Sequence, residues 1–412
     1  MAFAYRGGVL CAEEVSLEEI ARRFGTPCYV YSRAIMENNY GQFARALAGR
    51  AALIAYSVKA NSSLAVLALM ARLGAGFDIV SGGELFRVLR AGGDPAKVVF
   101  SGVGKTSAEI DAALAAGIFV FNAESEPELA LIDSLAHRRG RKARVAMRVN
   151  PGVEAATHAY ISTGGKAHKF GIDIDRAEAV YQRARQYSNL LIEGVSCHIG
   201  SQLLDQAQML GAIDSVLELI ERLRALKFPI HHADLGGGLG IPYKPEEPEP
   251  AIGAYIAAVR EKVAGRALHV TVEPGRSIVG NAGVLLTRVL YRKQTGDKEF
   301  VVVDAAMNDL IRPALYGAHH EILPVRATAA PPLLADIVGP VCETGDFLAR
   351  GREMPEVFPG DVLAVCTAGA YGFVQASTYN ARPRPAEVLI ENGSWRVIRA
   401  RETYEDLVRG EE

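Results

Sequence analysis

The feature that most constrains the fold is a regular alternation of short apolar runs with helical patterns between residues 51 and 275. Between the runs, apolar residues recur at helical spacing, as in Leu210, Ile213, Leu217 and Ile220. Such alternation predicts parallel strands joined by right-handed helical crossovers. Eight units of this kind predict an α/β fold, namely a (β/α)8 TIM-type barrel. The eight runs lie at 51–58, 76–80, 98–101, 119–122, 144–150, 194–198, 232–235 and 269–273.

A doubly wound open sheet is the alternative for the same alternation. That fold usually carries a glycine fingerprint directly after its first strand, where a dinucleotide pyrophosphate binds. Here the first run is followed by Lys59-Ala60-Asn61-Ser62, without a glycine. The barrel is therefore the favoured prediction.

After about residue 282 the pattern changes, because the apolar runs no longer have helices between them. Asn392-Gly393 separates the last two runs and predicts a two-residue hairpin turn. This half is expected to form a mostly antiparallel β-sandwich or barrel. The strand-like segment Tyr29-Val30-Tyr31 is expected to join it. The prediction is a barrel domain of residues 34–281 and a discontinuous β domain of residues 1–33 and 282–412.

Composition excludes several classes of protein. A net charge of -2 gives no basic surface for nucleic acid or an anionic membrane. No apolar run is long enough to span a bilayer. The five cysteines form no CxxC pair, and the two adjacent histidine pairs lack helical metal-site spacing, so no metal is expected. A cytoplasmic location and a small-molecule substrate are expected.

Active sites of TIM-type barrels lie at the C-terminal ends of the strands. Lys59 ends the first predicted strand, where partial desolvation would disfavour its ammonium form and free the amine as a nucleophile. Taken alone, a solvated lysine is the simpler interpretation. His198 ends the sixth strand and could act as a base, stack on a flat ligand or be structural.

The loops after strands seven and eight commonly build a phosphate site in such barrels. Here the seventh strand is followed by the glycines of 236–240, whose backbone N–H groups can approach an anion closely. The eighth is followed by Glu273-Pro274-Gly275-Arg276. These two loops predict bound phosphate.

A phosphate site beside a strand-end lysine suggests a phosphorylated aldehyde cofactor. Glu273 is suited to keeping a pyridine nitrogen protonated, which makes the ring an electron sink. Asp78, at the end of the second strand, could assist or could be an ordinary loop acid. By contrast, Ser81-Gly82-Gly83-Glu84 has capping-box spacing and predicts only the start of a helix.

Together these motifs resemble the fold-type III pyridoxal-phosphate-dependent decarboxylases, a family with an alanine racemase-like barrel, and within it the diaminopimelate decarboxylases. The resemblance covers nearly the whole chain. It rests on seven motifs in the same order: Tyr56-Ser57-Val58-Lys59-Ala60-Asn61, His198-Ile199-Gly200-Ser201, Gly236-Gly237-Gly238, Glu273-Pro274-Gly275-Arg276, Arg312-Pro313-Ala314-Leu315-Tyr316, Cys342-Glu343-Thr344-Gly345-Asp346 and Gly369-Ala370-Tyr371-Gly372.

The resemblance implies pyridoxal 5'-phosphate held as a Schiff base on Lys59, with His198 stacked on its ring and Glu273 at its nitrogen. Cys342 would be the proton donor, reaching in from the second subunit of a homodimer together with Glu343. Without the resemblance, Cys342 would be interpreted as a buried core cysteine. The phosphate would be held by Ser201, Gly236, Gly237, Gly238, Gly275, Arg276 and Tyr371. The substrate would be held by Arg276, Arg312, Tyr316, Glu343 and Tyr371.

The resemblance further implies decarboxylation of meso-2,6-diaminopimelate to L-lysine, the last step of lysine biosynthesis. The segment from His158 to Gly165, followed by Lys169-Phe170-Gly171, resembles the specificity region of diaminopimelate decarboxylases. A related decarboxylase acting on carboxynorspermidine, ornithine, arginine or carrier-linked glutamate is the alternative within the enzyme class. An inactive regulatory homologue is the alternative outside it, although a regulator needs neither Lys59 nor Cys342.

Overall fold

The computed structural model describes residues 3–152 and 169–412. The chain divides into two compact units, one formed by residues 40–241 and 249–277 and the other by residues 1–39, 242–248 and 278–412. No helix within the described ranges is both long enough and apolar enough to cross a membrane. The domain boundaries at 33/34 and 281/282 stay predictions.

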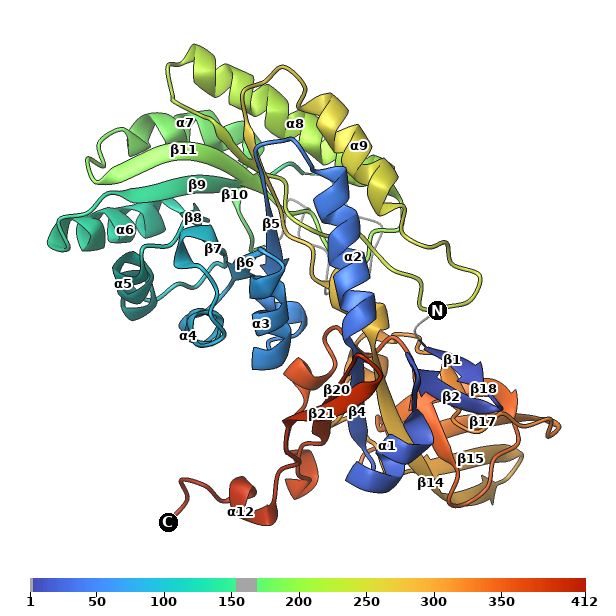
Figure 1. Cartoon of the computed structure of the whole chain (residues 1–412). Coiled ribbons are helices and arrows are strands. Elements are labelled where there is room, and N and C mark those ends of the chain that lie inside the picture. The colour runs from blue at the N-terminus through green and yellow to red at the C-terminus, as the bar shows by residue number, and fades with distance from the viewer. Residues whose placement is uncertain (1–2, 153–168) are drawn as a thin grey trace. The chain divides into compact units, whose positions relative to one another are not determined.

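The first unit is a closed barrel of parallel strands (Figure 1). Its strands pair in chain order, and the circle closes because β13 pairs with β5 and β8 pairs with β9. All eight predicted runs form barrel strands, so the predicted fold is confirmed. The strands are β5 (Ala52–Ser57), β6 (Gly76–Ile79), β7 (Val98–Phe100), β8 (Val120–Ala123), β9 (Ala143–Asn150), β11 (Leu190–Cys197), β12 (His232–Asp234) and β13 (His269–Val272).

Helix α2 precedes the first barrel strand, further helices follow the strands and flank them in Figure 1, and η3 leads into the second unit. Ser81 caps α4 by accepting from the Glu84 N–H group, while the Glu84 carboxylate accepts from Val80 rather than from Ser81. The predicted helix start is thus confirmed. The helices are α2 (Arg33–Ala46), α3 (Leu64–Arg72), α4 (Gly82–Arg90), α5 (Ser107–Ala116), α6 (Glu126–Arg138), α7 (Ile174–Ala184), α8 (Gln206–Ala225), α9 (Ile252–Lys262) and α10 (Arg276–Val279), with short 3-10 helices η1 (Val58–Ala60), η2 (Pro95–Lys97) and η3 (Gly280–Ala282).

The second unit is mostly antiparallel sheet built around one long strand, β14 (Gly283–Thr295). The N-terminal strand β4 (Cys28–Ser32) lies between β14 and β20, pairing antiparallel with the first and parallel with the second. The Asn392-Gly393 turn has positive φ at both residues and joins β20 to β21, as predicted. The strands not yet named are β15 (Lys298–Val303), β16 (Ile322–Pro324), β17 (Pro332–Val338), β18 (Phe347–Pro355), β19 (Val362–Val365), β20 (Ala386–Glu391) and β21 (Ser394–Arg399).

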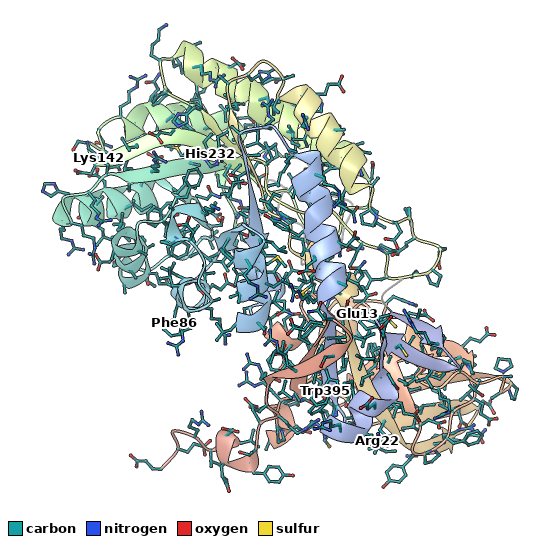
Figure 2. All side chains as sticks on the ribbon, in the orientation of Figure 1. Glu13, Arg22, Phe86, Lys142, His232 and Trp395 are labelled. Carbon is teal, nitrogen blue, oxygen red and sulfur yellow. The ribbon has the colours of Figure 1, made fainter. Side chains whose placement is uncertain are left out.

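Several elements of this unit were not anticipated from the sequence. A small sheet of β1 (Phe3–Arg6), β2 (Val9–Ala12) and β3 (Val15–Ser16) precedes α1 (Leu17–Phe24). Its apolar side chains join one core with those of β4, β14 and β20. Trp395 of β21, labelled in Figure 2, packs edge-on against Phe24 with ring centroids 5.0 Å apart. Short helical segments complete the unit at α11 (Arg312–Tyr316), η4 (Phe373–Gln375), η5 (Tyr379–Ala381) and α12 (Tyr404–Leu407).

Candidate active site

Lys59 lies in η1, directly after the first barrel strand, and its ammonium group forms an ion pair with Asp78. The Nζ–Oδ2 distance is 2.6 Å, and the Asp78 side chain is fully buried. Ser57 Oγ donates to the same carboxylate at 3.0 Å. Asp78 is therefore a buried strand residue rather than a loop acid. Desolvation alone would favour the neutral amine of Lys59. The negative charge of Asp78 acts in the opposite direction, because it favours the ammonium form.

The glycine loop after β12 approaches its neighbours so closely that no side chain fits. A Cβ at Gly237 would lie 2.1 Å from the Glu273 carbonyl oxygen, and one at Gly236 would lie 2.4 Å from the Cys197 carbonyl oxygen. Gly236 and Gly238 also have positive φ angles of 67° and 111°. The loop is thus a cradle without side chains, in which backbone can approach an anion closely. The N–H groups of Gly236 and Gly237 donate to Asp234 Oδ1 and His198 Nδ1.

Arg276 and Ser201 contact each other beside this cradle. Arg276 is buried, and its Nη2 donates to Ser201 Oγ at 3.0 Å. Gly275 packs tightly, since a Cβ there would lie 2.9 Å from that of Ser57. The structure therefore brings the predicted phosphate-binding residues of this unit to the same end of the barrel as Lys59.

His198 follows β11 and contacts the glycine loop through its ring. The Gly237 N–H group donates to His198 Nδ1 at 3.2 Å, so that nitrogen is an acceptor. Burial, followed by the positive charges of Arg148 and Lys59, lowers the pKa of His198 well below its usual range. The ring is therefore neutral at physiological pH.

Glu273 is buried after β13 and interacts with a second buried carboxyl group, that of Asp234 at the end of β12. Burial, together with the nearby Asp234 and Asp78, raises the pKa of Glu273 well above its usual range. Burial also raises the pKa of Asp234. Asn122 Nδ2 donates to Asp234 at 2.6 Å. No role was predicted for Asp234 or Asn122, because their proximity to Glu273 arises from barrel closure rather than from spacing in the sequence.

A second group missed from the sequence is a network of buried charges after strands β7 to β9. Glu124 accepts from Arg148 at 2.8 Å and from the N–H groups of Gly102 and Gly171 at 3.1 and 2.9 Å. Glu128 accepts from the buried Lys105 at 2.6 Å. Gly171 belongs to the predicted specificity region, of which His158–Gly165 lie outside the described residues.

The predicted substrate residues Arg312 and Tyr316 lie in the second unit, on α11. Arg312 is buried, with its guanidinium carbon 4.6 Å from the Tyr243 ring centroid and Nη1 2.8 Å from His320 Nε2. Tyr316 accepts from Gln375 Nε2 at 3.1 Å. The guanidinium is thus held in place by an aromatic face and a histidine.

Cys342 and Glu343 lie on an exposed turn of the second unit, so the core interpretation of Cys342 is wrong. The Cys342 N–H group donates to Asn380 at 2.8 Å, and Glu343 accepts from Tyr379 Oη at 2.8 Å. Tyr371, which is half-buried, has a positive φ of 55°, an uncommon conformation that turns the backbone sharply.

The barrel residues fit a phosphorylated pyridine aldehyde. Lys59 places an amino group beside Asp78, any side chain would fill the glycine cradle, and Glu273 provides a carboxyl group whose pKa is raised. Asp78 Oδ1 is buried and makes no hydrogen bond within residues 3–152 and 169–412. Together with the closed barrel, these features define the class of α/β-barrel enzymes that use such a cofactor.

Comparison with known proteins is specific. Residues 33–280 match the family described as pyridoxal-dependent decarboxylase, pyridoxal binding domain. The diaminopimelate decarboxylase of Pseudomonas aeruginosa is 56% identical, with 99% of this chain and 98% of that protein aligned. That of Aquifex aeolicus is 49% identical, covering 98% of this chain and 96% of the relative.

Solved structures agree in fold. Diaminopimelate decarboxylase from Helicobacter pylori, complexed with L-lysine, has a TM-score of 0.91 at 42% identity, covering 95% of this chain and 98% of that one. The M. jannaschii enzyme, also in complex with L-lysine, has a TM-score of 0.95 at 37% identity, with coverages of 100% and 98%. The chain belongs to the diaminopimelate decarboxylase family of pyridoxal-dependent decarboxylases. Its cofactor is pyridoxal phosphate, as predicted.

Proposed function

We propose that the protein decarboxylates meso-2,6-diaminopimelate to L-lysine and carbon dioxide, the last step of lysine biosynthesis. The observation that carries this proposal is the meeting of Lys59, the glycine cradle and Glu273 at one end of a closed barrel. Relatives named diaminopimelate decarboxylase, at 45–56% identity, support the choice of substrate.

Residues of the barrel, together with Tyr371 of the second unit, would hold the cofactor. Lys59 would carry it, with Asp78 beside the amine, and Glu273 would meet its ring nitrogen. His198 would lie against the ring, where its neutral imidazole adds no charge. When bound, the cofactor supplies an electron sink for the carbanion left by loss of carbon dioxide. The phosphate would be held by Ser201, Gly236, Gly237, Gly238, Gly275, Arg276 and Tyr371.

Two charged residues account for recognition of the substrate's distal end, which carries both a carboxylate and an ammonium group. Arg312 can form a bidentate pair with the carboxylate, and its contacts with Tyr243 and His320 orient its guanidinium. Glu343 can accept from the ammonium group. Arg276, Tyr316 and Tyr371 would complete the substrate site. A diamine precursor such as ornithine offers no distal carboxylate for Arg312.

Cys342 would return a proton to the substrate carbon after carbon dioxide leaves, acting from the second subunit of a homodimer. Its position on an exposed turn next to Glu343 supports an action across a subunit boundary. All five cysteines are free, which supports a location in the reducing cytoplasm.

The decisive experiment compares substrates. Purified protein loaded with pyridoxal phosphate is given meso-diaminopimelate, ornithine, arginine or carboxynorspermidine, and the released carbon dioxide and amine product are measured. Turnover of diaminopimelate to lysine is expected, with Lys59→Ala as the inactive control. Faster turnover of another substrate would reassign the specificity, and no turnover of any would favour a regulatory protein.

A mixing experiment tests the shared sites. Lys59→Ala and Cys342→Ala variants, each inactive alone, are denatured together and refolded. In a symmetric dimer with shared sites, random pairing restores one intact site in each heterodimer and thus about a quarter of wild-type activity. Heterodimers that form without activity would contradict sharing.

A further inference from the structure

Asp234 and Glu273 form a pair of buried carboxyl groups on neighbouring strands. Asp234, the last residue of β12, is fully buried, and Glu273, the residue after β13, is 5% exposed. The two strands pair with each other, and each carboxyl group acts on the pKa of the other. Two buried carboxyl groups on paired strands favour one shared proton, because two carboxylates can only accept hydrogen bonds and their negative charges repel.

The surroundings place that proton on Glu273. Both Asp234 oxygens already accept, Oδ2 from Asn122 Nδ2 at 2.6 Å and Oδ1 from the Gly236 N–H group at 3.0 Å. Among the described residues, the one donor near the Glu273 carboxyl group is Ser101 Oγ, at a long 3.5 Å from Oε1. Two N–H donors favour the anionic form of Asp234, so Glu273 is the donor within the pair.

Asp234 also connects the glycine cradle with Glu273. Its Oδ1 holds the first glycine of the cradle, and the Gly236 carbonyl accepts from the Glu273 N–H group at 2.8 Å. Among the described residues, charged or titratable groups that interact with the pair include Asp78 of β6, Lys59 of η1 and Cys197 of β11. Of these, Asp78 is engaged with Lys59.

We propose that Asp234 is a positioning residue for Glu273: it orients the Glu273 carboxyl group and keeps a single proton on the pair. The proposal rests on the proposed role of Glu273 at the ring nitrogen. A pair with one proton carries one negative charge, which balances one positive charge on a protonated ring nitrogen. Two unshared carboxylates buried here would repel each other at high cost.

Comparing the affinity for the cofactor with the affinity for an analogue distinguishes this positioning role from a purely structural role. Affinity is measured by fluorescence titration for pyridoxal phosphate and for its analogue with carbon in place of the ring nitrogen. Asp234→Asn is expected to weaken the binding of pyridoxal phosphate about tenfold, the size of one lost hydrogen bond to a charged group. Binding of the analogue should remain at the wild-type level.

Asp205→Asn is the matched control, because Asp205 likewise accepts from the N–H group two residues on, but at an exposed helix start. Asn122→Ala removes a donor from Asp234 without altering β12 and should shift pyridoxal phosphate affinity in the same direction, which covers the case that Asp234→Asn fails to fold. If these variants bind both ligands equally more weakly, Asp234 supports only the glycine loop and the proposal is wrong. Unchanged affinity for both ligands would also overturn the proposal.

Glu273→Gln tests the underlying assignment separately. It should also discriminate between the two ligands if Glu273 meets the ring nitrogen. If Glu273→Gln does not discriminate, the proposed role of Glu273 fails, and the role of Asp234 fails with it. If Glu273→Gln discriminates while the Asp234 and Asn122 variants do not, only the present proposal fails.

Discussion

The five cysteines differ in how far their thiol groups are buried. Cys197 is buried in a barrel strand, and burial raises the pKa of its thiol to about 12. Burial likewise raises the pKa of Cys28 to about 12. A thiol in such a place cannot readily exchange a proton, whereas Cys342 is exposed. Position thus favours Cys342 as the proton donor.

Changing Cys342 to alanine should therefore separate chemistry from binding. We expect kcat to fall by about 10² to 10⁴, the usual contribution of a positioned acid, with cofactor affinity unchanged. Steady-state kinetics and the visible absorbance of bound cofactor measure the two effects. Cys11→Ala, at a buried cysteine of the same unit, is the control. An equal loss of turnover and of cofactor affinity would indicate that Cys342 has a structural role.

At the scale of elements, most of the barrel could be predicted from the sequence. Parallel strands buried on both faces give continuous apolar runs, and all eight were visible. In the second unit, strand β18 was not predicted, because its charged residues Arg350, Arg352 and Glu353 interrupt the apolar pattern. The glycine cradle and Lys59 could be found because each directly follows a strand. The Asp234–Glu273 and Glu124 contacts could not, because they depend on how strands and loops meet in space.

The Glu124 network ties together the loops after β7 and β9, so its loss should destabilise the barrel. Glu124→Gln leaves the buried Arg148 without its carboxylate, and breaking a buried ion pair costs about 3–5 kcal/mol. Denaturant unfolding measures this free energy. Glu126→Gln, two residues along, breaks only an exposed pair with Arg183 and should cost less than about 1 kcal/mol. Similar costs for both variants would contradict the structural role of the network.

At the scale of the whole molecule, the buried His232 makes stability depend on pH. His232, labelled in Figure 2, shares a hydrogen bond with Thr271, with 2.9 Å between Nε2 and Oγ1. Its ring packs against Phe119. Burial, followed by the nearby His269 and His231, lowers its pKa from 6.5 to about 3. The folded barrel therefore keeps this ring neutral where the unfolded chain would protonate it.

The stabilisation linked to His232 is present above pH 6.5 and is lost as the pH falls from 6.5 towards 3, because the unfolded state then binds the extra proton. We expect the free energy of unfolding to decline over this range, and His232→Gln to make the decline shallower. Chemical denaturation at a series of pH values measures both. The exposed His137→Gln is the control, and identical slopes for the two variants would contradict this origin.

The place of β4 between β14 and β20 has a consequence for synthesis of the chain. This strand, all five of whose residues are buried in the finished sheet, leaves the ribosome about 250 residues before its first partner. At about 5–20 residues per second, the nascent strand stays unpaired for roughly 12 to 50 s. Throughout that interval an apolar strand edge is open to other chains, so early folding of the barrel and capture by chaperones decide how much of the protein escapes aggregation.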